Sequence, residues 1–326
     1  MRFLAKIFLL ITLIIPLSSL SGIWGFYGHQ KINRLAIFTL PSEMIAFYKH
    51  HIRYITENAV NPDKRRYAVE GEAPRHFIDI DVYGDSAIYK MPRYWNAAVE
   101  QFTEDTLQAY GIVPWHVYRM KGWLTDAMRI RDAKAILRLS AELGHYIADA
   151  NVPLHTTENY NGQLTGQKGI HGLWESRLPE LFSEEYDFLV GRAEYIENTQ
   201  LAIWQGVTQA HEALDSVLQY EIMVSQKLEE DKKYSFETRG AATVKVYSRE
   251  FSKEYHAMLN HMVERQMRRA VKMVGDFWYT CWIDAGQPDL EAIIGVEFSE
   301  EELKQRKEEL QLWKEKRYSS RAHEVE

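Results

Sequence analysis

Two histidine–carboxylate pairs constrain this chain more than any other feature of its sequence. His145 and Asp149 lie in G-H-Y-I-A-D-A-N-V-P-L-H, which ends at His155, and H-G-L-W-E runs from His171 to Glu175. Residues four apart on an α-helix leave the same face, so each pair can hold a cation between its side chains. Because His155 adds a fifth ligand, the set is too large for one four-coordinate zinc ion. The sequence therefore predicts a site for more than one metal ion.

Residues 1–23 differ in composition from the rest of the chain. Arg2 and Lys6 flank the start of an apolar run at 7–15, and Pro16 and several small residues follow it. This order is typical of a secretory signal peptide, and the run is short for a membrane span. We therefore predict a protein exported to the periplasm or secreted, with an uncleaved membrane anchor as the alternative.

The remainder of the chain has helical periodicity almost throughout. Apolar residues recur at helical spacing over 44–55, 136–147 and 259–277, and only 76–82 looks locally extended. No linker or internal repeat divides the region. The prediction is one all-α, multi-helix domain over residues 24–297.

The last 29 residues, 298–326, are expected to be separate from that domain. Ser299 and Glu302 form a capping box, and a Glu/Lys/Arg run follows them. The prediction here is a charged, solvated helix that frays from Ser319 onward.

Cysteine content and net charge narrow the choice of ligands and partners. Cys281 is the single cysteine, so the ligands of any zinc site must be histidines and carboxylates. The formal net charge of −7 argues against tight, nonspecific binding to duplex nucleic acid, which needs a basic surface. Nothing in the sequence implies a stable protein partner, and we predict a monomer.

The order and spacing of these motifs resemble a known superfamily of trinuclear zinc enzymes. Its members are the single-strand-specific nucleases and the bacterial zinc-dependent phospholipases C. The resemblance extends from Trp24 to about Gly286. It implies an all-α domain built around three zinc ions, which activate water against a phosphodiester.

The resemblance also implies which residues bind each zinc ion. Trp24, as the first residue of the mature chain, would bind one ion through its amine and carbonyl, together with His29. A second ion would take Asp63, His76, His145 and Asp149, with Asp149 bridging the first two ions. The third and more exposed ion would take His155, His171 and Glu175.

Further roles follow from the same resemblance. Asp63 would orient or deprotonate the attacking water, and Arg66, in P-D-K-R-R-Y, would face the phosphate. Phe77 and Asp79, in H-F-I-D, would stack on and hydrogen-bond a nucleotide base.

Substrate choice is expected to depend on the loop between His155 and His171. Within it, Asn159 and Tyr160 would border the exposed zinc ion and contact the substrate. The short length of this loop, 15 residues, is closer to the phospholipase pattern.

Three branches of function stay open on the sequence. Arg66 favours a single-strand-preferring nuclease, acting on nucleic acid or nucleotides, and this is the prediction. Glu175, where the nucleases usually carry Asp, favours a phospholipase C acting on phospholipid head groups. A non-catalytic, zinc-stabilised binding module is the third reading.

The residue before the predicted cleavage site is unusual. Ile23 stands where signal peptidase prefers a small residue.

Overall fold

The computed structural model describes residues 25–66, 68–239 and 242–297, and the single positions 301, 304 and 308. The predicted signal peptide over 1–23, Trp24 as a zinc ligand and the capping box at Ser299 and Glu302 lie outside the described residues. Among the described residues, no helix is both long and apolar enough to cross a membrane.

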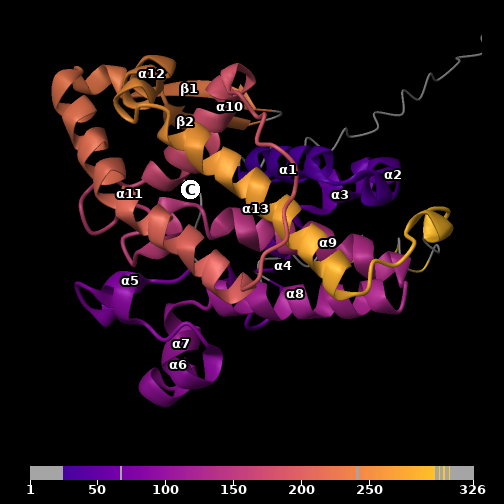
Figure 1. The fold of residues 1–326 in the computed structure, drawn as a ribbon. Helices are drawn as coiled ribbons and strands as arrows, with labels where there is room; N and C mark the ends of the chain where they lie inside the picture. Colours follow the sequence, from indigo (N-terminus) through magenta and orange to yellow (C-terminus); the bar gives the residue numbers. More distant parts are fainter. Residues whose placement is uncertain are drawn as a thin grey trace, which may run out of the picture.

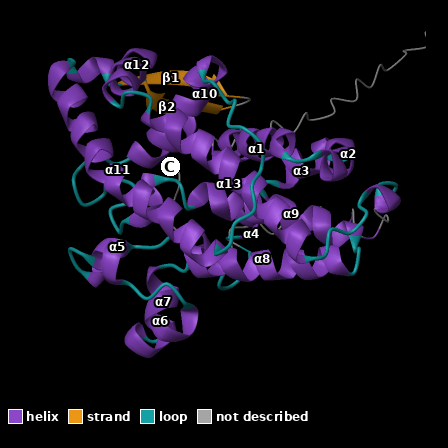
Figure 2. Ribbon diagram, viewed as in Figure 1, coloured by secondary structure: helices purple, strands orange, loops and turns teal. Residues whose placement is uncertain are grey.

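The described residues form a mostly helical single domain, which confirms the predicted all-α class (Figures 1 and 2). The α-helices are α1 (Gly25–Ala36), α2 (Ser42–His50), α3 (Ile52–Asn58), α4 (Asn61–Arg65), α5 (Ala87–Lys90), α6 (Trp95–Phe102), α7 (Glu104–Tyr110), α8 (Val113–Arg129), α9 (Ala133–Asp149), α10 (Leu178–Phe182), α11 (Thr199–Lys227), α12 (Arg249–Met258) and α13 (Met262–Asp284). Short 3-10 helices are η1 (Ile37–Thr39), η2 (Ala73–His76), η3 (Ile80–Tyr83), η4 (Pro153–Thr156), η6 (Ser183–Glu185), η7 (Glu230–Lys232) and η8 (Glu291–Ile293), and η5 (Gly172–Arg177) is a π-helix.

Helix α9 lies at the centre of the packing. It contacts α1, α3, α8 and α13, and α13 in turn contacts α1 and α8. The apolar stripe Ile136, Leu139, Leu143 and Ile147 is buried along α9, as its spacing predicts. Because α9 is buried on nearly all sides, the two ligand residues that it carries are placed on the most enclosed helix of the domain.

Hydrogen bonds to Ser140 of α9 join this helix to α2 and α13. The hydroxyls of Tyr48 and Ser140 share a hydrogen bond of 2.9 Å, and Trp278 Nε1 donates to the Ser140 carbonyl oxygen at 3.1 Å. The rings of Tyr48 and Trp278 stack with centroids 5.0 Å apart. These contacts fix α2 and α13 against α9 and satisfy the polar atoms that the packing buries.

Helix α1 approaches α9 closely one residue before His145. Asn33 Nδ2 donates to the Ala141 carbonyl oxygen at 2.9 Å. A Cβ atom at Gly144 would lie 2.0 Å from Asn33 Oδ1, so only glycine allows this approach without a shift. The spacing of α1 and α9 sets the distance between His29 and His145, which these helices carry.

We expect Gly144→Ala to lower the free energy of unfolding by about 1–3 kcal/mol, because the added methyl group overpacks the α1–α9 contact. Gly122→Ala is the matched control: Gly122 also lies inside a helix, α8, but a Cβ there meets nothing within 4 Å. That control should raise stability by up to about 1 kcal/mol through helix propensity. Urea unfolding of both variants measures the difference, and equal stabilities would contradict the close approach.

A two-stranded hairpin is the part of the fold that the sequence analysis did not predict. Strands β1 (Tyr234–Arg239) and β2 (Ala242–Tyr247) pair antiparallel, with Tyr234 opposite Tyr247 (Figure 2). A lone hairpin is marginal in water, and this one is held by ion pairs to other elements. Lys233 Nζ lies 2.7 Å from Glu221 Oε1 of α11, and Arg177 of η5 pairs with Glu237 of β1.

Two further segments differ from their predicted structure. The helix expected over 44–55 is divided at His51 into α2 and α3, and His51 Nε2 lies 2.9 Å from the Ile294 carbonyl oxygen. In 76–82, Phe77 has extended backbone angles, but η3 begins at Ile80. Tertiary contacts decide both outcomes: the extended part donates a hydrogen bond from Ile78 N to the His155 carbonyl oxygen at 2.9 Å.

Candidate metal centre

Eight of the nine predicted ligand residues lie in the described chain, and the structure brings them to one place. They come from six segments: His29 from α1, Asp63 from α4, His76 from η2, His145 and Asp149 from α9, His155 from η4, and His171 and Glu175 from the start and the interior of η5. All are buried except Asp63, whose side chain is 14% exposed. Their donor atoms form three groups, each able to hold a metal ion.

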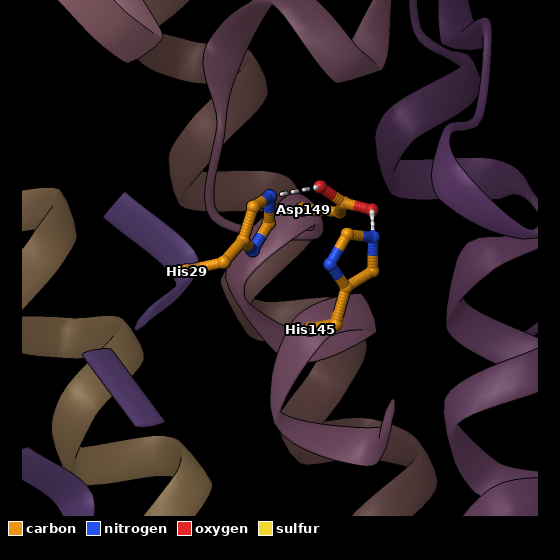
Figure 3. Close-up of side chains that lie close together, drawn as sticks. All are labelled: His29, His145 and Asp149. Carbon is orange, nitrogen blue, oxygen red and sulfur yellow. Dashed lines mark ion pairs between the residues drawn. The ribbon is translucent and has the colours of Figure 1, made fainter. Parts of the chain in front are cut away.

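The first group is His29, His145 and Asp149. Asp149 directs its two oxygens in different directions, one toward each histidine (Figure 3). Its Oδ1 lies 3.4 Å from His29 Nε2, and its Oδ2 lies 3.2 Å from His145 Nε2. This divergence is the arrangement that a carboxylate needs in order to contact two ions, one through each oxygen.

The second group is Asp63, His76 and His145. His76 Nδ1 lies 2.9 Å from Asp149 Oδ2 and 3.7 Å from Asp63 Oδ1. His145 Nε2 lies 3.0 Å from His76 Nδ1 and 3.7 Å from Asp63 Oδ1. His145 and Asp149 therefore connect the first and second groups.

The third group is His155, His171 and Glu175. The two Nε2 atoms are 3.2 Å apart, and Glu175 Oε2 lies 2.6 Å from His171 Nε2 and 3.5 Å from His155 Nε2. His155 Nδ1 donates to the His76 carbonyl oxygen at 2.6 Å, and His171 Nδ1 donates to the Tyr160 carbonyl oxygen at 3.1 Å. Because each Nδ1 carries the donated proton, each Nε2 keeps a lone pair for a metal ion.

The donor spacing fits a metal ion in each group. Tetrahedral zinc, with bonds of about 2.0–2.1 Å, places its ligand atoms about 3.3–3.4 Å from one another. The facing histidine nitrogens of the second and third groups, 3.0 and 3.2 Å apart, are close to this spacing. In the third group, where both Nε2 atoms carry lone pairs, a cation between them would remove the repulsion of those lone pairs. Imidazole and carboxylate ligands suit zinc and other divalent transition metals, so the donor set gives the class of ion.

The charges in the centre act in opposite ways on metal binding by Asp149 and by His29. Although burial, the largest effect, acts to raise the pKa of Asp149, the charges of His145 and His155 and the hydrogen bonds from histidines hold it well below its ordinary value. Burial lowers the pKa of His29, but the hydrogen bond with Glu175 and the charges of nearby carboxylates raise it to about 9. Asp149 is thus ionised at neutral pH, and a metal ion has to displace a proton from His29.

The helix that follows His171 is a π-helix, where the sequence predicted an α-helix. It spans Gly172–Arg177 and contains Glu175. π-Helices are rare and occur often at functional sites. Arg177, at its end, is buried and donates to both oxygens of Glu237 in β1, at 3.0 and 2.5 Å. The hairpin therefore fixes the segment that carries Glu175.

Arg66 lies beside this centre. Its side chain is 2% exposed, and its Nη1 atom is 3.6 Å from Asp63 Oδ1. Its Nε and Nη1 atoms make no hydrogen bond within the described part of the chain. A buried guanidinium whose donors lack an acceptor is costly, and an anion bound at the edge of the centre would supply one.

The residues predicted to contact the substrate are more buried than that prediction implies. Phe77 is 6% exposed and Asp79 is fully buried, and both remain predictions as base contacts. Asn159 uses its amide inside the loop, donating to Thr165 Oγ1 at 3.0 Å and accepting from Leu164 N at 2.8 Å. Tyr160 accepts from His171 through its carbonyl oxygen. What the structure assigns to this loop is the support of a ligand histidine.

A cavity of about 30 Å³ adjoins His29 and Glu175 on the side of α13. Most of its other lining residues are apolar, among them Ile32, Trp174 and Met267. This volume has room for water, which needs about 10–15 Å³ per molecule.

Glu72 is a residue of this region that the sequence analysis missed. It is fully buried, four residues before His76, and its Oε1 atom lies 3.8 Å from His76 Nε2. The spacing E-x-x-x-H in the sequence was the available signal, but single pairs of this kind are common on solvated helices.

The fold and the centre together define the class of this protein. It is a mostly helical protein with three buried His/Asp/Glu groups, each able to hold a metal ion. No protein-family model and no curated protein matches the chain.

Proposed function

We propose that this protein is an exported, zinc-dependent phosphodiesterase that preferentially cleaves single-stranded nucleic acid. The observation that carries the proposal is Arg66, a buried cation with unused hydrogen-bond donors beside Asp63, a predicted ligand of the candidate metal centre. Trp24 remains a predicted ligand that would complete the centre. The resemblance to the single-strand-specific nucleases supports the same choice.

The centre has the chemistry that phosphate-ester hydrolysis requires. Zinc ions held by the three groups would lower the pKa of bound water to about 7 and offset charge on the phosphoryl oxygens. Phosphoryl transfer depends mainly on positioning and on electrostatic stabilisation. The chain's own residues must therefore orient the water, accept its proton and hold the phosphate.

Asp63 is suited to orient the water. Its Oδ1 atom lies 3.7 Å from both His76 Nδ1 and His145 Nε2, and 3.6 Å from Arg66 Nη1. It is also the most exposed of the three ligand carboxylates, since the side chains of Asp149 and Glu175 are 1% and 9% exposed. A proton taken up by Asp63 can therefore pass to solvent.

Arg66 is suited to hold the phosphate. Its guanidinium can donate two parallel hydrogen bonds to phosphoryl oxygens, which fixes the phosphorus relative to Asp63. The charge that develops on these oxygens in the transition state strengthens the same bonds.

We expect Arg66→Gln to lower kcat on single-stranded DNA about 100-fold, as loss of one transition-state donor does. The protein is loaded with zinc, its N-terminus is verified as Trp24, and it is assayed in parallel on single-stranded DNA and on phosphatidylcholine vesicles. Arg53→Gln is the control, because Arg53 lies in an exposed pair with Glu57. The control should match the unsubstituted protein.

The two substrates separate the competing functions. Cleavage of DNA that falls in Arg66→Gln supports the nuclease. Turnover of phosphatidylcholine without cleavage of DNA would replace it with the phospholipase C function. A folded, zinc-loaded protein that hydrolyses neither substrate would leave the non-catalytic binding module.

A further inference from the structure

A second layer of side chains lies behind His76, on the side away from the metal groups. His76 turns Nδ1 toward Asp63, His145 and Asp149, and it turns Nε2 toward Glu72. The ring of His76 is thus placed between a carboxylate on one side and the candidate metal position on the other.

Glu72 is held in place by three donors. Tyr146 donates its hydroxyl to Glu72 Oε1, Arg75 Nη1 donates to Oε2 at 2.6 Å, and Arg65 Nη2 lies 3.6 Å from Oε1. A fully buried carboxylate is stable only when its charge is compensated in this way. These contacts therefore hold the carboxylate of Glu72 in a fixed position.

Tyr146 connects this layer to the ligands themselves. It lies next to His145 on α9, and its ring packs edge-on against His76 and His145, with centroids 5.3 and 5.4 Å apart. Its hydroxyl reaches past these rings to Glu72. The orientation of His76 thus depends on a unit of Glu72 and Tyr146.

We propose that Glu72 is a positioning residue for the metal centre: it stabilises the His76 tautomer that carries its proton on Nε2 and so presents Nδ1 as the ligand atom. A carboxylate behind a ligand histidine also raises the basicity of the ring. This inference rests on the proposed metal centre and not on the phosphodiesterase activity.

Glu142 provides a matched control for Glu72. It is also a buried carboxylate and also pairs with Arg65, at 2.8 Å from Nη1, but the described contacts place no ligand histidine against it. Loss of charge compensation around Arg65 affects both variants alike. Loss of support for His76 affects only Glu72→Gln.

The test is a zinc titration of the full protein against a graded series of competing chelators, with bound zinc counted by atomic emission. We expect Glu72→Gln to weaken the ion held through His76 by 10- to 100-fold, the usual effect of removing such a partner. Glu142→Gln should bind zinc as the unsubstituted protein does. Tyr146→Phe, which keeps the ring and removes only the hydroxyl, should weaken the same ion by a smaller factor and serves if Glu72→Gln does not fold.

A second readout follows the tautomer directly. With ¹⁵N-labelled histidine, NMR of the zinc-free protein should show a shift of the His76 ring nitrogens in Glu72→Gln and none in Glu142→Gln. Unchanged affinity and unchanged nitrogen shifts in Glu72→Gln, or equal changes in both variants, would overturn the proposal. Absence of zinc binding by the unsubstituted protein would instead overturn the metal centre itself.

Discussion

Replacing Asp149 by Asn is expected to lower the proposed phosphodiesterase activity about a thousandfold or more, which corresponds to about 4 kcal/mol of transition-state stabilisation. The two oxygens of Asp149 face different groups, with His29 on one side and His76 and His145 on the other. An amide has the same shape but no negative charge, and its nitrogen cannot act as a ligand. Two metal positions should therefore be affected by one substitution.

The measurement is zinc content together with the initial rate on single-stranded DNA. Asp149→Asn should lose bound zinc as well as activity, whereas Glu142→Gln, a buried carboxylate on the same helix, should keep both. Full zinc content with normal activity in Asp149→Asn would show that Asp149 bridges no ions.

Removal of zinc is expected to have the second large effect, a fall in Tm of about 15 °C or more. Free zinc at about a thousand times its Kd adds about 4 kcal/mol of stability for each ion bound only by the folded state. Two such ions add about 8 kcal/mol, and each kcal/mol is worth about 2 °C or more in a domain of this size. Without the ions, the buried carboxylates of Asp149 and Glu175 would be compensated only by the surrounding histidines.

Thermal unfolding followed by circular dichroism, with and without a chelator, measures this shift. Adding back zinc in excess of the chelator should restore the original Tm, which excludes damage by the chelator. Calcium or magnesium should restore little, because histidine nitrogens are poor ligands for these hard cations. A change in Tm below about 3 °C would mean that the groups bind zinc weakly or not at all.

The all-α class and the two histidine–carboxylate pairs could be predicted because both depend on local spacing. The association of His29, Asp63 and His76 with these pairs was implied only by the resemblance to the trinuclear zinc enzymes, since no local spacing connects these segments. His145 and Asp149 are four apart within an apolar repeat, so one helix had to place them together inside the protein. Glu175 illustrates the limit of this reasoning. Its pairing with His171 is as expected, but the segment is a π-helix. The hydrogen bonds of a π-helix join residues five apart instead of four, and the spacing of His171 and Glu175 alone does not reveal this difference.

The features that the sequence did not reveal depend on contacts between distant segments. The hairpin of β1 and β2 is supported by Arg177 and Glu221, which lie outside it. Glu72 faces His76 because Tyr146, 74 residues away, holds it there. Asp79 matches a pattern associated with base contacts, yet neighbouring elements bury it completely. Local pattern carries no information about such neighbours.

The packing of α1 against α13 has a consequence for the protein during its synthesis. Helix α1 carries His29 and is made first, while α13, which covers it, begins at Met262 (Figure 1). At about 5–20 residues per second, the ribosome needs roughly 10 to 50 s to make the chain between them. During that interval α1 has α9 available as a partner but lacks α13, so the packing around His29 is incomplete. Loading of metal is therefore expected to follow completion of the chain, and truncation before α13 should yield a product that proteases remove.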